Sequence, residues 1–311
     1  MTPDLLARSL RLLRQHQFFI WLGLGMSLSS LFGTGWRLWL AQVISFDFSQ
    51  LAGLQSIESL LFSSEVAHMQ QLLLRGLLLA FGQFVLVWLV ALWAEAGVIT
   101  AVTNHNSQPI TLRQSVRWGR QWLGRFLAID LLVFFPWFLI ALLMFLVILI
   151  LALVLASFAS SEPSAGTVLL TAGLGLTCLV GLAALLLPVG LASLWVRLLT
   201  FREAVLHGVA GRTAVRHTWQ RIRQNFGDII VLIVVLWGGQ TLLLGALNIV
   251  TSPLLTWLTS LTTSDTMALQ MASWLAVAAI TLLAWLLRGI VTAFVAIAWT
   301  LAYANLGEEK G

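Results

Sequence analysis

The sequence contains very few charged residues, a single cysteine and a single lysine. Only 9% of its 311 residues are Asp, Glu, Lys or Arg, whereas 59% are hydrophobic, and the mean hydropathy is +0.95. A chain this poor in charge cannot cover a folded core with a polar surface, which excludes an ordinary soluble domain. The lone Cys178 supports neither a disulfide framework nor a cysteine-based metal site. Lipid is therefore the expected solvent of this protein.

The basic residues, all arginine apart from Lys310, are concentrated in short segments between long apolar runs. This layout is typical of a polytopic membrane protein and not of a nucleic-acid-binding protein, because the clusters flank runs of spanning length. The sequence predicts an all-α fold with six transmembrane helices in a single integral membrane domain, 1–311. The predicted spans are residues 18–40, 72–102, 126–158, 167–199, 229–261 and 268–301.

The connecting segments predict the orientation in the membrane. The N-terminal tail and residues 104–125 and 200–228 are rich in arginine, whereas the other three connections carry acidic residues without Lys or Arg. Loops rich in Arg and Lys stay on the cytoplasmic side of a membrane. We therefore predict a multi-pass protein of the bacterial cytoplasmic membrane with both termini in the cytoplasm.

Small residues mark one face of the first predicted span. Gly25, Ser29 and Gly33 recur at four-residue spacing, which allows a neighbouring helix to approach closely. We expect this face to pack against another helix.

Two of the basic segments resemble each other. Residues 115–126 align with residues 214–226 with one residue of slack, and each contains a Val-Arg pair, a tryptophan and a final phenylalanine. Each segment has an apolar face bordered by arginines, which predicts two amphipathic helices at the cytoplasmic membrane surface. The similarity also predicts an internal repeat of residues 95–158 and 203–261. The bordering arginines are Arg113, Arg117, Arg120, Arg212, Arg216 and Arg223.

These arginines have two interpretations. In the first, they anchor the helices, because their stems lie along apolar surface while their guanidinium groups meet lipid phosphates. In the second, they form a docking surface for an anionic partner, which is either a lipid head group or a membrane or cytosolic protein.

Several motifs resemble a known membrane domain. The motifs are Glu95-Ala-Gly-Val-Ile-Thr-Ala-Val, Leu112-Arg-Gln-Ser-Val-Arg, Arg202-Glu-Ala-Val-Leu-His-Gly-Val-Ala-Gly-Arg and Trp299-Thr-Leu-Ala-Tyr-Ala-Asn-Leu. Together they resemble the six-helix membrane domain of glycerophosphoryl diester phosphodiesterases and of related uncharacterised bacterial membrane proteins. In that family the hydrolase is a separate soluble barrel domain, whereas here only the acidic tail 307–311 follows the last predicted span. The resemblance therefore implies the fold and not the hydrolase activity.

Three charged residues lie inside predicted spans. Arg288 is well inside the sixth span, Glu95 is near the inner end of the second, and Asp130 is one turn into the third. A charge at such depth is costly unless it faces protein or water. One hypothesis is a structural ion pair between Arg288 and either Glu95 or Asp130. The other is a polar transport site formed around all three residues.

The sequence predicts no catalytic chemistry. It contains no Gly-rich phosphate loop, serine elbow, paired-carboxylate site or metal-ligand spacing among its histidines, so we expect neither an enzyme nor a cofactor or metal site. The predicted function is a non-enzymatic scaffold or accessory membrane component that binds anionic lipid or a protein partner through its arginine-rich helices. The alternative is a small-solute or lipid transporter with a polar site around Arg288, Glu95 and Asp130.

Overall fold

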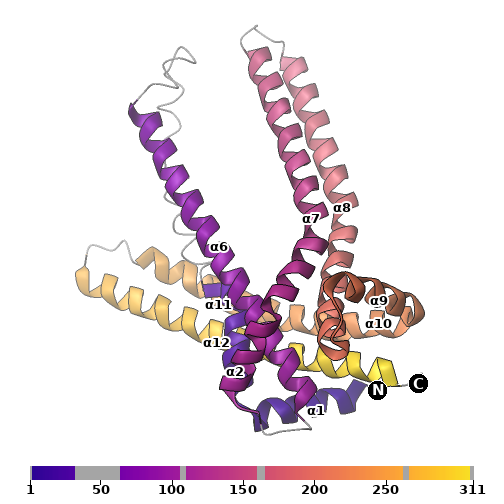
Figure 1. The fold of residues 1–311 in the computed structure, drawn as a ribbon. Coiled ribbons are helices and arrows are strands. Elements are labelled where there is room, and N and C mark those ends of the chain that lie inside the picture. The colour runs from indigo at the N-terminus through magenta and orange to yellow at the C-terminus, as the bar shows by residue number, and fades with distance from the viewer. Residues whose placement is uncertain (1, 32–63, 106–109, 160–164, 262–265, 309–311) are drawn as a thin grey trace. The chain divides into compact units, whose positions relative to one another are not determined.

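The computed structural model describes residues 2–31, 64–105, 110–159, 165–261 and 266–308, and the regular structure there is entirely helical (Figure 1). Over parts of the long helices, including residues 64–74, 147–159 and 165–172, only the backbone is described. The helices in chain order are α1 (Thr2–Gln15), α2 (Phe18–Met26), α6 (Ser64–Asn104), α7 (Leu112–Ala159), α8 (Ala165–His207), α9 (Gly211–Gln224), α10 (Phe226–Leu232), the π-helical segment η1 (Ile233–Gly238), α11 (Gly239–Leu261) and α12 (Met267–Glu308).

Four segments of the described chain are long and apolar enough to cross a membrane. They are Leu78–Asn104, Leu112–Met144, Phe226–Leu261 and Met267–Leu306. Each exceeds the ~20 residues that a helix needs to cross a bilayer. The described part of the chain is thus all-helical, and its four long apolar helices indicate a multi-pass membrane protein.

The part of the chain that the structure describes shows four of the six predicted spans and not the other two. The first predicted span, 18–40, contains α2, whose nine residues rise only about 14 Å against about 30 Å of hydrocarbon. This helix ends where the hydroxyls of Ser27 and Ser30 bond to nearby backbone carbonyls, and residues 32–40 lie outside the described residues. The fourth predicted span, 167–199, falls in α8, where many side chains lie outside the described residues, and α8 is not among the four.

The chain divides into two compact units. The first comprises Met1–Leu123 and Gly227–Gly311, and the second comprises Gly124–Phe226. The core of the first unit lies where α2 packs against α6 and α12. Its buried side chains are Leu12, Leu13, Phe19, Leu22, Ala94, Val98, Ala101, Val102, Ile110, Ala293, Ala296 and Ile297.

Glycines bring α2 into close contact with its neighbours. A Cβ added at Gly23 would lie 2.7 Å from the Cβ of Ala293 on α12, and one at Gly25 would lie 3.1 Å from the Cβ of Ala94 on α6. The predicted close approach at Gly25 therefore occurs, while Gly33 lies outside the described residues. The tightest approach on this helix is at Gly23, which the four-residue pattern does not include.

The N-terminal tail is a helix, α1, which packs along α12 in the first unit. Its buried face includes Leu5, Ser9 and Leu12, whereas Arg8, Arg11 and Arg14 are exposed. Leucines and a small serine at three- and four-residue spacing place one apolar face against the protein. The arginine-rich N-terminal tail is thus an amphipathic helix that precedes the first predicted span.

The second unit is built from α8, the part of α7 that begins at Gly124, and α9. Phe126 of α7 stacks on Phe201 of α8 with ring centroids 4.0 Å apart, and the Trp137 indole nitrogen donates to the Ser193 hydroxyl at 2.8 Å. Residues later in α7 thus meet residues earlier in α8, so the two helices are antiparallel neighbours (Figure 1). Helix α9 packs against α8.

The two predicted amphipathic helices differ in structure. Residues 211–224 form the separate helix α9, and Asn225 is the capping residue at its end. The first segment is not a separate helix, because α7 continues unbroken from Leu112 through the predicted boundary at Phe126. Its first three turns belong to the first unit and the remainder to the second.

Candidate functional site

The start of α7 is held close to the end of α6 in the first unit. The Trp93 indole nitrogen on α6 donates to the backbone carbonyl of Val116 on α7 at 3.0 Å. Gly119 permits this approach, since a Cβ there would lie 2.5 Å from the carbonyl oxygen of Trp93 and 3.0 Å from its ring. The two helices are therefore fixed by a side-chain bond and by the absence of a side chain at Gly119.

A capping box fixes where α7 begins. The backbone amide of Thr111 donates to Oε1 of Gln114 at 2.9 Å, and the backbone amide of Gln114 lies 3.4 Å from the Thr111 hydroxyl. This reciprocal pairing of Thr and Gln three residues apart satisfies backbone donors that the first turn leaves without helical partners. Because the start of α7 is fixed, the face of the helix on which the following arginines lie is fixed as well.

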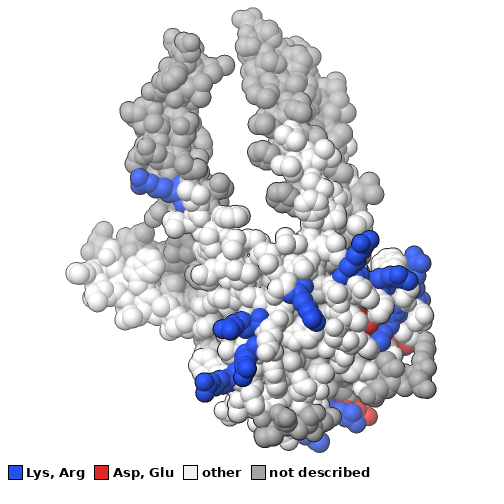
Figure 2. Space-filling view, viewed as in Figure 1, with Lys and Arg blue, Asp and Glu red and all other residues white. Residues whose placement is uncertain are grey.

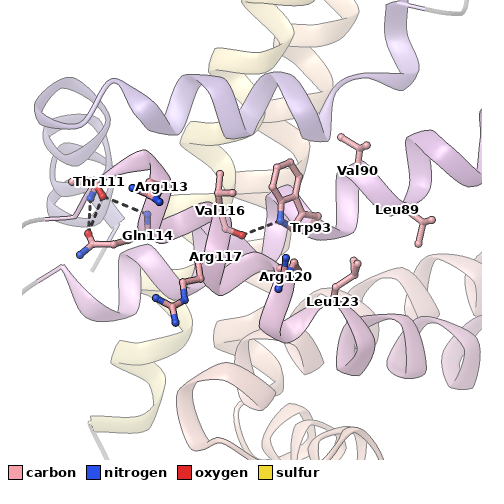
Figure 3. Close-up of a pocket in the computed structure, with 10 residues that line it drawn as sticks. All are labelled: Leu89, Val90, Trp93, Thr111, Arg113, Gln114, Val116, Arg117, Arg120 and Leu123. Carbon is pink, nitrogen blue, oxygen red and sulfur yellow. Dashed lines mark hydrogen bonds between the residues drawn. The ribbon is translucent and has the colours of Figure 1, made fainter.

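Between the two helices lies a groove with a volume of about 800 Å³ (Figure 3). Its lining combines apolar side chains from both helices with three arginines from α7. The lining residues are Leu89, Val90, Trp93, Thr111, Arg113, Gln114, Val116, Arg117, Arg120 and Leu123. No Asp or Glu is among them, so the groove pairs an apolar floor with a positively charged rim.

The three groove arginines are Arg113, Arg117 and Arg120, at the spacing i, i+4 and i+7 that places residues on one helical face. All three are exposed. On the face drawn in Figure 2, basic side chains are more prominent than acidic ones among the described residues. The predicted arginine border of the first amphipathic segment thus forms one wall of a groove, whereas no pattern in the sequence indicates the opposite wall on α6.

The second arginine-bearing segment is α9 in the second unit. Arg212, Arg216 and Arg223 are exposed there, and the Arg223 guanidinium lies 5.4 Å from the ring centroid of Trp219. Trp219 is itself 47% exposed, whereas the side that packs on α8 contains the buried Thr218. The helix therefore presents an exposed aromatic ring beside its arginines.

A buried carboxylate joins α9 to α8. Glu203 of α8 is 2% exposed, and its oxygens lie 3.3 Å from Nδ1 of His207, 3.4 Å from Nδ1 of His217 and 3.4 Å from Nη1 of Arg221. Sequence reasoning missed this cluster. Its available signal was a pair of four-residue spacings, Glu203 to His207 on one helix and His217 to Arg221 on the next.

Asp130, one of the predicted site residues, is buried in the second unit and bound by Arg197. Nε of Arg197 lies 2.5 Å from Oδ1 of Asp130, and Nη2 lies 3.3 Å from Oδ2. The same guanidinium lies 4.6 Å from the ring centroid of Phe201. This fork-like pair is a structural ion pair between α7 and α8, and Arg197 was not among the predicted site residues.

The other two predicted site residues belong to the first unit. Arg288 on α12 donates a hydrogen bond from Nη2 to Oδ1 of Asn248 on α11. Glu95 is half-buried on α6. Arg288 therefore has a neutral partner that the sequence pattern does not indicate, and Asp130 has Arg197.

Comparison with protein-family models, with curated proteins and with solved structures gave no match for this chain. The resemblance to the membrane domain of glycerophosphoryl diester phosphodiesterases remains a prediction from its motifs. Within the described part of the chain, no three His, Cys, Asp or Glu residues are placed together so that they could hold a metal ion.

Proposed function

We propose that this protein is a non-enzymatic component of the bacterial cytoplasmic membrane that binds anionic lipid through its arginine-bearing segments. In this proposal the groove between α6 and α7 holds a lipid head group, and α9 makes a second contact with the same membrane surface. Both segments and both termini face the cytoplasm, as the distribution of arginines predicts.

The observation that carries the proposal is the combination of charge and apolar surface in the groove. Arg113, Arg117 and Arg120 supply guanidinium groups that match phosphate oxygens, and Leu89 and Val90 supply apolar surface beside them. An amphiphile with an anionic head satisfies both properties at once. A purely polar anion would leave the apolar floor unused.

The surface of α6 beyond the groove favours lipid over a protein partner. Leu79 and Leu86 precede the groove residues on the same face of α6, at the spacing i and i+7, and are 73% and 55% exposed. A lipid whose phosphate meets the arginines can lay its acyl chains along this apolar surface. The groove is therefore continuous with a surface that already requires contact with lipid.

The arginines set the expected size of the effect. A basic residue near an anionic membrane surface contributes about 1 kcal/mol, so three contribute up to about 3 kcal/mol. This corresponds to an affinity difference on the order of a hundredfold. Direct bonds to one head group add specificity for the groove over the remaining basic surface.

The test is the retention of phosphatidylglycerol by purified protein in micelles of a neutral detergent, measured by lipid extraction and mass spectrometry. The triple variant Arg113→Gln, Arg117→Gln, Arg120→Gln should retain far less phosphatidylglycerol than the wild type, while phosphatidylcholine retention stays unchanged.

The matched control removes the same charge elsewhere. Arg8, Arg11 and Arg14 are exposed on α1 and do not line the groove, so their replacement by Gln should leave most of the retention intact. Equal retention in the wild type and the groove variant would overturn the lipid assignment in favour of a protein partner. Equal losses in the two triple variants would show that net charge acts and the groove does not.

A further inference from the structure

A second cavity, of about 420 Å³, lies between α11, α12 and the residues that follow α2, all within the first unit. Its lining residues are Ser29, Ser30, Asn248, Thr251, Ser252, Leu255, Thr281, Ala284, Trp285 and Arg288. Apart from Leu255, Ala284 and Trp285, each of them carries a hydroxyl, an amide or a guanidinium group. This polarity contrasts with the apolar floor of the groove.

The polar residues form a face on each of two otherwise apolar helices. Asn248, Thr251 and Ser252 lie at i, i+3 and i+4 on α11, and Thr281 and Arg288 lie at i and i+7 on α12. Both helices belong to segments long and apolar enough to cross a membrane. Polar side chains at such positions are costly unless they face protein, water or a polar ligand. Here they face a common cavity.

The cavity is positively charged and polar, although the hydroxyls of Ser30 and Thr251 donate to backbone carbonyls and not into it. Arg288 lines it, and no Asp or Glu is among its lining residues. The bond from Arg288 to Asn248 fixes the guanidinium group at the cavity wall. The Thr281 hydroxyl is buried and has no hydrogen-bond partner among the described residues. A buried hydroxyl without a partner carries a free-energy cost that an acceptor in the cavity would remove.

The wall beside Arg288 is also fixed in position. The indole nitrogen of Trp285 donates to the backbone carbonyl of Leu24 at 3.2 Å, which holds the ring between α12 and α2. One turn further along α12, Gly289 packs so closely on α2 that an added Cβ would lie 2.6 Å from Cδ2 of Leu24. Arg288 therefore projects from a part of α12 that is held in place by packing, as a binding site requires.

We propose that this cavity binds a phosphate-type oxyanion, supplied either as free phosphate or as the phosphate of a lipid. The Arg288 guanidinium matches two oxygens of such a group, and Thr281, Asn248 and Ser252 supply neutral donors around it. At about 30 Å³ per water, the cavity has room for an oxyanion together with several waters. The site is separate from the groove and uses none of its residues.

The test is isothermal titration of the full-length protein in neutral detergent with two probes, inorganic phosphate and the soluble lipid dihexanoyl phosphatidic acid. Asn248→Asp keeps the shape of the side chain but places a carboxylate against Arg288. The new ion pair should reduce affinity for either probe by at least about a hundredfold, because it neutralises the guanidinium and repels the anion. Far-ultraviolet circular dichroism reports whether the variant is folded.

A second variant removes only a neutral donor. Thr281→Val is close to isosteric and should weaken binding by about tenfold, since a hydrogen bond to a charged group is lost. The matched control is Thr241→Val on α11, an exposed threonine outside the cavity, which should bind as the wild type does. The groove variant lacking Arg113, Arg117 and Arg120 should also retain the binding of inorganic phosphate.

Binding of inorganic phosphate supports a site for free anion, and binding of the lipid probe alone supports a site for lipid phosphate. The proposal is overturned if neither probe gives saturable binding to the wild type. It is equally overturned if Asn248→Asp, or Thr281→Val where the first variant does not fold, binds with wild-type affinity. Loss of lipid retention by the groove variant has no bearing on these outcomes, so the two proposals fail independently.

Discussion

Replacing Gly23 by alanine should force α2 and α12 apart and destabilise the first unit. The new Cβ would lie 2.7 Å from the Cβ of Ala293 and closer still to the carbonyl oxygen of Gly289. Favourable contacts between carbon atoms occur at about 3.5–4.0 Å, so the helices must separate by about 1 Å. Neither obstacle can rotate away, because one is a backbone atom and the other is a Cβ.

The loss of folding free energy comes from the core contacts that this separation stretches. Phe19 and Leu22 on α2 belong to the same buried cluster as Ala293 and Ile297 on α12. A gap of about 0.5–1 Å forfeits about a quarter to a half of each contact energy, and overpacked cores lose about 1–3 kcal/mol. We expect about 2–3 kcal/mol here, because no change of rotamer relieves the contact. The measurement is the SDS fraction that unfolds the protein in mixed micelles, followed by tryptophan fluorescence.

Two further glycines provide a graded control. An alanine at Gly25 would place its Cβ 3.1 Å from the Cβ of Ala94, which is tight but closer to an ordinary contact, so its effect should be smaller. An alanine at Gly245 on α11 would have no atom within 4 Å and should leave stability unchanged or raise it by up to about 1 kcal/mol. The reasoning is refuted if Gly23→Ala and Gly245→Ala unfold at the same SDS fraction.

Two other predictions concern the buried charges of the second unit. Asp130→Asn should destabilise the protein by about 3 kcal/mol, at the low end for a broken buried pair because the Arg197 side chain is 20% exposed. Adding Arg197→Gln to this variant should restore part of the loss, and unchanged SDS midpoints in all three proteins would contradict the pairing. Glu203→Gln should loosen α9 from α8, because the histidine and arginine partners lose a carboxylate. Hydrogen exchange in α9 should then accelerate relative to α7, and equal exchange in the variant and the wild type would contradict that role.

Local patterns in the sequence predict most of the long helices but not all of their ends. The apolar runs of α6, α11 and α12 are local and continuous, so their hydropathy is sufficient to identify them. Hydropathy also predicts a first span that extends beyond the end of α2. The run Ser27-Leu-Ser-Ser consists of apolar or small residues, but two of its serine hydroxyls bond to the backbone. In α1 the spacing of Leu5, Ser9 and Leu12 indicates a helix. A search by hydropathy does not find this helix, because the arginines between these residues lower its mean hydropathy.

One aligned position explains why the two related basic segments end differently. Arg125 in the first segment corresponds to Asn225 in the second, and α7 continues through the former while α9 ends before the latter. The Asn225 side chain lies 3.4 Å from the backbone carbonyl of Arg221, one turn earlier. Asparagine competes for backbone partners and favours helix ends, whereas arginine favours helix continuation. The internal repeat itself remains a prediction.

The sequence predicts that charges inside spans need partners, but it does not identify them. Asp130 and Arg197 are distant in the chain, and only the antiparallel pairing of α7 with α8 places them together. Arg288 is bonded to Asn248, whose neutral amide gives no signal in a search for opposite charges. The groove is a similar case, because its arginines were identified from the sequence while its apolar wall depends on how α6 meets α7.

The groove lies where the surface of α6 changes from exposed to buried. Along α6, exposure falls from 55% at Leu86, on the groove face, to 0% at Leu92, a distance of about 9 Å. The groove residues Leu89 and Val90 lie within this transition, and Trp93 lies just beyond it. A head group bound there would contact arginines at the edge of the packed core while its acyl chains follow the exposed surface of α6. The end of the protein core on α6 therefore brings arginines beside exposed apolar surface, which is the arrangement that the proposed binding of an anionic lipid requires.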